Sequence, residues 1–212
     1  MRAPLAVAGY TDEVLDAVGG TLTEAERDRA ARFTRKQDRL DFVAAHLLVR
    51  HCAAELLGVR ACALTLVQSC ERCGRSHGRP SIAEAPGLSV SLAHTSGYVS
   101  AAAGLGKVGV DAEHATAGQA DENLIALALT SAEADLVGLD NRRLIRLWVR
   151  KEALVKRGEL ALDRLREVDL SKLPFEGRAH EWDGRHLLEW TSGTVIATAI
   201  FNEPGELRLM GA

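Results

Sequence analysis

Helix signals precede strand signals twice along this chain, and that order constrains its fold more than any other feature. In the first block, Thr23 and Glu26 form a capping-box pattern. Apolar residues at helical spacing from Leu40 to Leu57 predict a longer helix that ends at Gly58. Runs rich in apolar and β-branched residues then predict strands at 59–67, 88–92, 98–103 and 108–113.

The second block has the same order. One helix is predicted at 122–129. A second begins after Ser131 as its N-cap, and a third spans 142–157 after Asn141 as its N-cap. Strands are predicted at 187–190, 195–201 and 207–209, and the Gly-, Ser- and Pro-rich stretch 70–86 is predicted to be a loop. We therefore expect an α+β fold with two similar α/β halves, 1–105 and 106–212, although no residue-level repeat is visible.

Composition places the chain among ordinary globular proteins. Of its 212 residues, 47% are apolar and 26% charged, which suffices for a substantial core in one or two domains. The net charge of −3 gives no indication of nucleic-acid binding. There is no run of about 18 apolar residues to span a membrane and no clear signal-peptide core. The expected location is cytoplasmic, where the four cysteines, Cys52, Cys62, Cys70 and Cys73, would be reduced.

Two carboxylates on one predicted strand suggest a metal site. Asp111 and Glu113 lie in the run Val108-Gly109-Val110-Asp111-Ala112-Glu113, and residues i and i+2 of a strand face the same side. Two like charges so close repel each other unless a cation lies between them. Few oxygen ligands suit Mg²⁺, which keeps several waters and binds substrate phosphates. The alternative is a strand end that enters solvent, where acidic residues are common.

A later helix supplies a third carboxylate and a cation. Glu152 and Lys156 lie one turn apart and share a helix face. If this helix packs on the strand, Glu152 would be a third oxygen donor and Lys156 could neutralise a phosphate. Glu followed by Lys four residues later is also the commonest helix-surface pair, worth only about 0.2–0.5 kcal/mol. Trp148 argues against a surface pair, because a large ring one turn before Glu152 implies partial burial.

These two segments and three others resemble one known family. The two are Gly109 to Glu113 and Trp148-Val149-Arg150-Lys151-Glu152-Ala153-Leu154-Val155-Lys156. The others are Ala93-His94-Thr95-Ser96-Gly97, His77-Gly78-Arg79-Pro80 and the stretch from Lys36 to Arg50. In this order they resemble the 4′-phosphopantetheinyl transferases of the surfactin-synthetase type, over roughly residues 21–160.

The resemblance implies a fold and a reaction. The two halves would pack as a pseudo-two-fold dimer within one monomeric chain. The enzyme would move the 4′-phosphopantetheine arm of coenzyme A onto a serine of an acyl or peptidyl carrier protein, releasing 3′,5′-ADP. The resemblance assigns Asp111, Glu113 and Glu152 to Mg²⁺, Glu152 also to general-base duty, and Lys156 to the phosphate that leaves.

The resemblance also implies contacts with coenzyme A. It assigns His94 to a phosphate, for which a neutral structural histidine is the alternative. It assigns Arg79 and Pro80 to the adenine side, and Lys36 and Arg50 to the 3′-phosphate side; nearby alternatives are Arg32, Arg35 and Arg39. The chain departs from the family at Ala93, where a serine is usual, and the lost hydrogen bond to an anion is worth about 1.5–3 kcal/mol. It departs again in the short stretch 157–160 after Lys156.

Other interpretations stay open. Cys70, Cys73 and His77 have zinc-like spacing, but a closed zinc site needs a fourth ligand, for which Cys62 is a candidate. Glu133 is either a second base or an acid that stabilises a helix start. The chain could also be a non-catalytic module that binds coenzyme A or a carrier protein. The helix 142–157 is either a solvated face or a docking surface for an acidic carrier protein, since it contains Arg142, Arg143, Arg146, Arg150, Lys151, Lys156 and Arg157.

Overall fold

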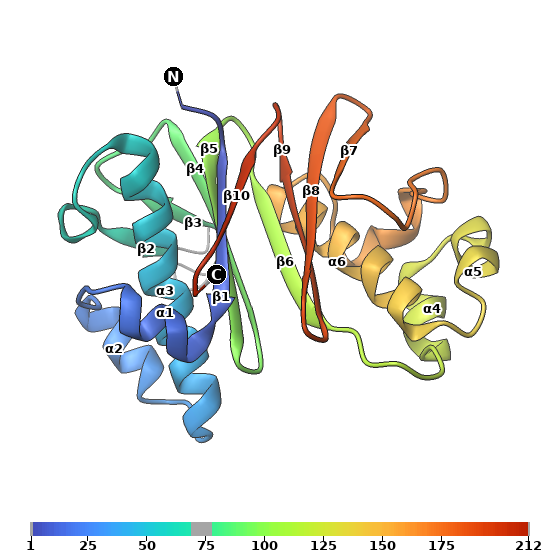
Figure 1. Cartoon of the computed structure of the whole chain (residues 1–212), viewed down its shortest axis with the longest axis horizontal. Helices are drawn as coiled ribbons and strands as arrows, with labels where there is room; N and C mark the ends of the chain where they lie inside the picture. The colour runs from blue at the N-terminus through green and yellow to red at the C-terminus, as the bar shows by residue number, and fades with distance from the viewer. Residues whose placement is uncertain (1, 69–77, 212) are drawn as a thin grey trace.

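The computed structural model describes residues 2–68 and 78–211 and shows a mixed α+β fold with two sheets (Figure 1). Within these residues, no helix combines the length and hydrophobicity that a membrane crossing requires. The elements in chain order are β1 Leu5–Tyr10, α1 Thr11–Ala17, α2 Glu24–Ala30, α3 Lys36–Leu57, the 3₁₀ helix η1 Ala61–Ala63, β2 Leu66–Gln68, β3 Pro80–Ile82, β4 Leu88–Thr95, β5 Tyr98–Leu105, β6 Gly109–His114, α4 Glu122–Ala128, α5 Ser131–Val137, α6 Asn141–Arg157, the 3₁₀ helix η2 Leu162–Glu167, β7 Ala179–Trp182, β8 Arg185–Ser192, β9 Val195–Phe201 and β10 Glu206–Leu209.

The strand order of the two sheets is similar. The larger sheet has the order β10-β1-β5-β4-β3-β2, and the smaller has the order β6-β9-β8-β7. Strand β1 is followed along the chain by the three helices α1–α3, and strand β6 is followed by the three helices α4–α6. The set β1-β5-β4-β3 thus corresponds to β6-β9-β8-β7. The last strand, β10, joins the larger sheet, where it pairs in parallel with β1.

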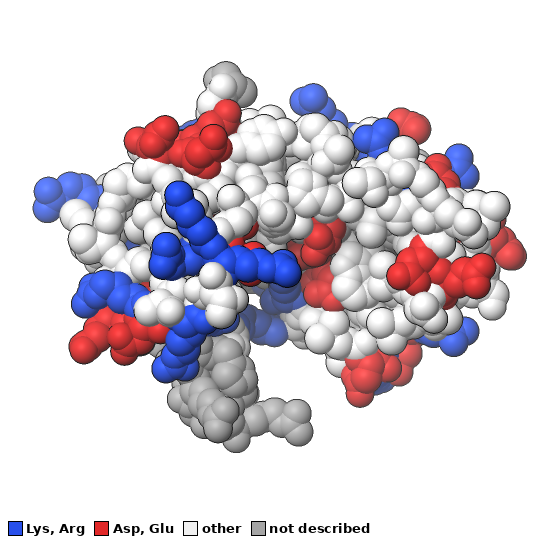
Figure 2. All heavy atoms as spheres, turned by 90° about the horizontal axis from the view of Figure 1, so that it is seen from below, with Lys and Arg blue, Asp and Glu red and all other residues white. Residues whose placement is uncertain are grey.

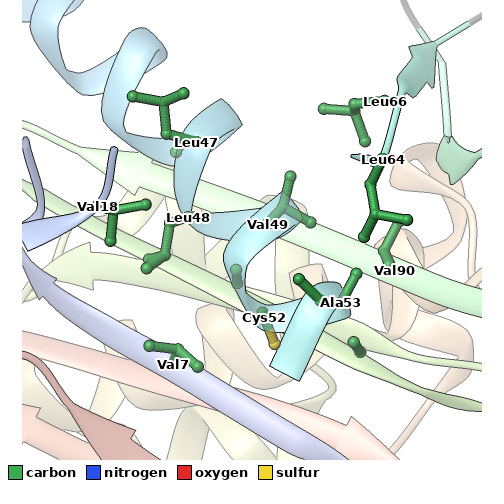
Figure 3. Close-up of a cluster of buried hydrophobic side chains, with 14 of the residues drawn as sticks. Val7, Val18, Leu47, Leu48, Val49, Cys52, Ala53, Leu64, Leu66 and Val90 are labelled. Atoms are coloured by element: carbon green, nitrogen blue, oxygen red, sulfur yellow. The ribbon is translucent and has the colours of Figure 1, made fainter. Parts of the chain in front are cut away.

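The molecule has four layers: α1–α3, the larger sheet, the smaller sheet, and α4–α6 (Figure 1). Strand residues alternate between two faces, so one face of the larger sheet, including Val7 and Val90, packs under Leu48 and Cys52 of α3 (Figure 3). Its other face is rich in alanine and packs on Val110, Ala112 and neighbours in the smaller sheet. The far face of the smaller sheet packs against α6, where Leu144, Leu147 and Ile200 are buried.

The ends of the main helices follow from local sequence. The capping box of Thr23 and Glu26 is confirmed, because each side chain accepts a hydrogen bond from the other residue's backbone N–H. Helices α3 and α6 end at Gly58 and Gly158, whose φ values of 71° and 76° are left-handed and suit glycine. The two predicted N-caps are wrong by one residue, since Thr130 and Asp140 cap α5 and α6.

Some predicted strands differ from the structure. The segment 59–67 is mostly not a strand, since the small residues at 61–63 form η1 and only Leu66 and Val67 join β2. The strand β4 extends through Thr95, so the predicted turn at 94–97 is shorter, and Gly97 takes its left-handed position with a φ of 78°. Sequence patterns do not predict β1, β3 or β7, and β3 lies in the predicted loop. β1 shows no alternation because both of its faces are buried.

Candidate functional site

The predicted acidic residues lie where β6, β4 and α6 meet. Gly109 begins β6 on the face toward α6, and a Cβ built at this position would lie 2.0 Å from the backbone oxygen of Ala153. The absence of a side chain at Gly109 therefore lets the backbone of α6 approach the strand closely. Asp111 and Glu113 follow at alternate positions of β6 and lie on this same face, beneath α6.

An ion pair connects β6 to α6 at this point. The ammonium of Lys156 lies 2.8 Å from Oδ1 of Asp111 and also donates to the backbone oxygen of Leu92 on β4, at 3.3 Å. Asp111 is buried, whereas the Lys156 side chain keeps 30% of its surface exposed. The cation is thus held by both sheets and remains accessible to a ligand.

All three carboxylates resist ionisation. Burial raises the pKa of Asp111, although Lys156 opposes this effect. Burial also raises the pKa of Glu113, and the neighbouring charge of Asp111 raises it further. The pKa of Glu152 is raised first by burial and then by the charges of Asp111 and Glu113. The structure therefore brings the three predicted carboxylates within electrostatic reach of one another.

Carboxylate oxygens are suitable ligands for a divalent cation, but the described residues do not form a complete ligand set. A cation among three carboxylates would relieve their repulsion. Within residues 2–68 and 78–211, however, no group of three or more His, Cys, Asp or Glu residues is placed to hold a metal ion, and Asp111 instead pairs with Lys156. This arrangement suits Mg²⁺ that takes further oxygens from water and a substrate phosphate.

The tip of the β4–β5 hairpin completes one side of the site. Thr95 donates a hydrogen bond to Oε2 of Glu113 at 3.0 Å, and the His114 ring lies 2.8 Å from the backbone oxygen of Ser96. His94, at the end of β4, is more than one-third exposed. Partial burial of the ring lowers its pKa, and the positive charge of Lys156 lowers it further. A neutral imidazole at this position can donate one hydrogen bond to a phosphate.

Asp41 holds this hairpin tip from the other side, and sequence patterns do not predict it. Asp41 lies on α3, is 2% exposed, and accepts hydrogen bonds from the backbone N–H of Gly97 at 3.2 Å, from Thr11 and from Gln37. The only signal in the sequence is an acidic residue on the apolar face of a predicted helix. Because buried carboxylates require partners, such a residue predicts a polar contact but not its identity.

The predicted coenzyme A residues lie in different surroundings. Lys36 is exposed at the start of α3. Arg50 is buried, and its guanidinium donates to Glu26 and to the backbone oxygen of His46. Burial opposes ionisation of Glu26, but hydrogen bonds from His46, Thr23 and Arg50 outweigh it and lower its pKa to about 2. Arg50 thus neutralises a buried carboxylate, and no signal distinguishes this role in the sequence.

Arg79 and Pro80 lie near the end of α6. Arg79 is exposed, and its guanidinium lies so close to Gly158 that a Cβ at that position would overlap it. Pro80 begins β3. Ala93, in contrast, is buried in the core between the sheets. It belongs to an apolar cluster that includes Tyr98 and Ala112, so a hydroxyl at this position would have apolar neighbours.

The basic helix α6 is not one continuous solvated face. Arg150 and Lys151 are completely buried, and Arg157 is nearly so. Arg150 pairs with Glu189, and Lys151 donates to Glu133 at 2.6 Å and to three backbone oxygens. Glu133 itself accepts from Lys151 and two backbone N–H groups. Burial lowers the pKa of Lys151 despite the nearby carboxylate.

Two further features do not bear on the acidic site. Cys70, Cys73 and His77 lie outside the described residues, as does part of the predicted turn at 77–80. Cys62 is an exposed free thiol. In the described part of the chain, a pocket of about 280 Å³ is lined by Phe42, His46 and neighbours on α2 and β2, not by the acidic residues. The acidic site is therefore an open junction between elements rather than part of that pocket.

Comparison of the chain with protein-family models gave no match, and comparison with curated proteins gave none either.

Proposed function

We propose that this protein is a magnesium-dependent 4′-phosphopantetheinyl transferase. It would move the phosphopantetheine arm of coenzyme A to a serine of an acyl or peptidyl carrier protein. The serine oxygen would form a bond to the β-phosphorus, and the bond to the leaving 3′,5′-ADP would break. The observation that supports this proposal most is the junction of β6 and α6, which gathers Asp111, Glu113, Glu152 and Lys156 at one place.

The side chains of the junction suit this reaction. Bound Mg²⁺ would neutralise the pyrophosphate and stabilise the leaving phosphate. Asp111, Glu113 and Glu152 would supply its protein oxygens. Glu152 accepts no side-chain hydrogen bond among the described residues, and its raised pKa suits a base for the serine proton.

Two further side chains would act on the phosphates. Lys156 would offset the charge that develops on the leaving phosphate. His94 would donate a hydrogen bond to a phosphate oxygen, as a neutral ring beside Lys156. Both residues have access to solvent, Lys156 with 30% of its side chain exposed. A ligand could therefore reach them without displacing the core.

The proposal extends to the fold and the coenzyme contacts. We propose that the halves 1–105 and 106–212 are related by a pseudo-two-fold axis, supported by the matching strand orders. Arg79, Pro80 and Lys36 would contact coenzyme A, whereas Arg50 would act through the buried Glu26 rather than directly. One chain supplies residues from both halves, so the protein would act as a monomer, in the cytoplasm with its coenzyme.

Mass spectrometry of an apo carrier protein tests the proposal. Incubation with the protein, coenzyme A and Mg²⁺ should add one phosphopantetheine, and EDTA should abolish the addition. Glu152→Gln should remove transfer while leaving the fold intact. Absence of any mass gain across several acyl and peptidyl carrier proteins, with the enzyme folded, would contradict the proposed reaction.

One observation favours a second candidate, a non-catalytic module that binds coenzyme A or a carrier protein. Lys156 already neutralises Asp111, and the described residues form no three-ligand metal site. Calorimetric titration with coenzyme A separates the two candidates. Binding that is independent of Mg²⁺, without release of 3′,5′-ADP, would identify a module. Binding that requires Mg²⁺ would support the transferase.

A further inference from the structure

Two ion pairs connect α6 to the smaller sheet, and they differ in exposure. Arg150 binds Glu189 on β8, and Lys156 binds Asp111 on β6. Both side chains of the first pair are completely buried, whereas the Lys156 side chain keeps 30% of its surface exposed. Figure 2 shows charged side chains of both signs on one face of the molecule, where water and salt weaken ion pairs. The Arg150–Glu189 pair is removed from such screening by its burial.

The two carboxylates belong to one row of side chains across the sheet. Glu189 lies opposite Thr198 on β9, and Thr198 lies opposite Asp111 on β6. Residues directly opposite each other on neighbouring strands point to the same face of a sheet, so all three face α6. The Thr198 hydroxyl also donates to Oε1 of Glu189 at 3.0 Å. One end of this row therefore carries a carboxylate of the proposed active site, and the other end carries Glu189.

Glu189 holds Arg150 in a fixed direction. Arg150 donates from Nε to Oε1 at 3.0 Å and from Nη2 to Oε2 at 2.8 Å. Two further cationic side chains lie close to Oε2, with Nε2 of His180 at 3.0 Å and Nη1 of Arg146 at 3.6 Å. Burial opposes ionisation of Glu189, but Arg150 and Arg146 outweigh it and lower its pKa. Two parallel hydrogen bonds fix the orientation of a guanidinium as well as its distance, so this pair restricts rotation of α6.

The restriction acts on Glu152, two residues further along α6. Two residues correspond to about 200° around a helix, so Arg150 and Glu152 lie on nearly opposite sides of α6. With Arg150 held toward β8, Glu152 is directed toward β6, where burial and then the charges of Asp111 and Glu113 raise its pKa. A rotation of α6 would move Glu152 away from these carboxylates.

The proposed reaction requires the exposed pair to separate. It gives Asp111 to a divalent cation and Lys156 to a phosphate. Two cations at one carboxylate repel each other, so a cation at Asp111 would displace the ammonium of Lys156. Arg157, which donates to the backbone oxygen of Ile200 on β9, would still hold the last residue of α6. Arg150 would hold the helix on the other side of Glu152, and two fixed points define its orientation on the sheet.

We propose that Glu189 is a positioning residue, whose pair with Arg150 keeps α6 in place on the sheet while Lys156 moves from Asp111 to a phosphate. This inference rests on the proposed function, because the ligand draws Lys156 away. Glu189 touches no substrate in this scheme and acts through α6. A buried pair suits this role because its separation would leave an uncompensated charge in the core, which is strongly unfavourable.

Hydrogen exchange of the α6 amides, measured by mass spectrometry in metal-free protein, tests the proposal. Lys156→Gln reproduces the departure of the ammonium and is measured alone, with Glu189→Gln, and with the control Glu133→Gln. Glu133 is a buried carboxylate that pairs with Lys151 on α6. It lies on α5 and not on the sheet, so the control makes the same chemical change outside the row.

We expect Lys156→Gln alone to raise the exchange rate of α6 by no more than about fivefold, as for an exposed ion pair. Together with Glu189→Gln, the rise should exceed the product of the two single effects at least about tenfold. With Glu133→Gln, the single effects should multiply to within about twofold, because the two sites share no partner. Where transfer is detectable, Glu189→Gln should lower kcat about 100-fold and leave the KM for coenzyme A within about twofold.

A second variant serves if Glu189→Gln does not fold. Arg150→Met combined with Glu189→Met leaves no buried charge at the pair, and such replacements are often neutral or stabilising. If the pair only stabilised the fold, this variant would respond to Lys156→Gln as the wild type does. A positioning role predicts that Lys156→Gln raises exchange of α6 at least about tenfold more in this variant than in the wild type.

Two results would overturn the proposal. One is a response of the Arg150→Met, Glu189→Met variant equal to that of the wild type, and the other is single effects of Lys156→Gln and Glu189→Gln that simply multiply. Because exchange is measured without substrates, coupled effects in a protein that shows no transfer would refute the proposed reaction and still support Glu189 as the residue that holds α6. Normal transfer without coupled effects would refute the positioning role alone.

Discussion

Gly109→Ala tests the contact on which the site depends. An added Cβ would lie 2.0 Å from the backbone oxygen of Ala153 and 2.8 Å from the backbone nitrogen of Arg157, whereas ordinary contact begins near 3.4 Å. Helix α6 would have to move away from β6 by about 1.4 Å, the difference between 3.4 and 2.0 Å. Both colliding atoms belong to the helix backbone, so no side-chain rotation relieves the overlap.

The expected cost is about 3 kcal/mol of the free energy of unfolding, the upper part of the range for overpacked cores. For a chain of this size, that corresponds to a fall of about 6–12 °C in the thermal midpoint. The displacement also separates Glu152 and Lys156 from Asp111. A misplacement of about 1 Å lowers a reaction rate about 100-fold, so the proposed transfer reaction should fall by that factor at a temperature where the variant is folded.

Gly87→Ala is the matched control. Position 87 is exposed, and a Cβ there meets no atom within 4 Å. The control should stay within about 0.5 kcal/mol of the wild type. Urea unfolding followed by circular dichroism measures both variants. If Gly109→Ala matched the control in stability, α6 would not contact β6 as described, and the reasoning about the site would fail with it.

Three other variants test the supports of the site. Lys151→Met should lower the free energy of unfolding, measured in urea, by about 3–5 kcal/mol, because Glu133 is left buried without its cation. If adding Glu133→Gln to this variant restored none of the lost stability, the explanation would be wrong. Asp41→Ala should cost about 1–3 kcal/mol by releasing the hairpin tip, whereas Asp38→Ala, in the first turn of the same helix, should cost less than about 1 kcal/mol. The pKa of Glu152 is raised from its usual 4.5, so the folded state holds this proton more tightly than the unfolded chain. In EDTA, thermal stability should therefore fall as the pH rises from about 4.5 through the raised pKa, and Glu152→Gln should lessen the fall. If the thermal stability of Glu152→Gln changed with pH as that of the wild type does, the result would argue against a raised pKa of Glu152.

The parts of the fold that follow from local chemistry could be predicted. Caps, helical periodicity and glycine stops act within a few residues, so they predict α2, α3 and α6 with boundaries within about four residues of those observed. The carboxylate strand β6 was also found, because its apolar alternation is local. Strands β1, β3 and β7 were not found, since β1 is buried on both faces and β3 and β7 have only three and four residues.

The candidate site also contains residues that the sequence predicts and residues that it does not. Residue types and spacing predict that Asp111, Glu113, Glu152 and Lys156 act together. The structure shows that they lie within electrostatic reach of one another, and their joint action stays a prediction. The role of Asp41 was not predictable, because its partner Gly97 lies 56 residues away along the chain. No local pattern records which distant backbone group will accept or donate to a buried side chain.

The basic residues show most clearly what each level decides. The sequence by itself determined how many cations the helix 142–157 contains and that 32–39 is also basic. Only the tertiary structure decided that Arg150 and Lys151 are buried against carboxylates while Arg32, Arg35 and Arg39 remain in solvent. Charge is a property of one residue, but burial and pairing depend on the packing of elements that are distant in sequence. Desolvation then determines whether a cation stabilises the core or is free to bind a partner.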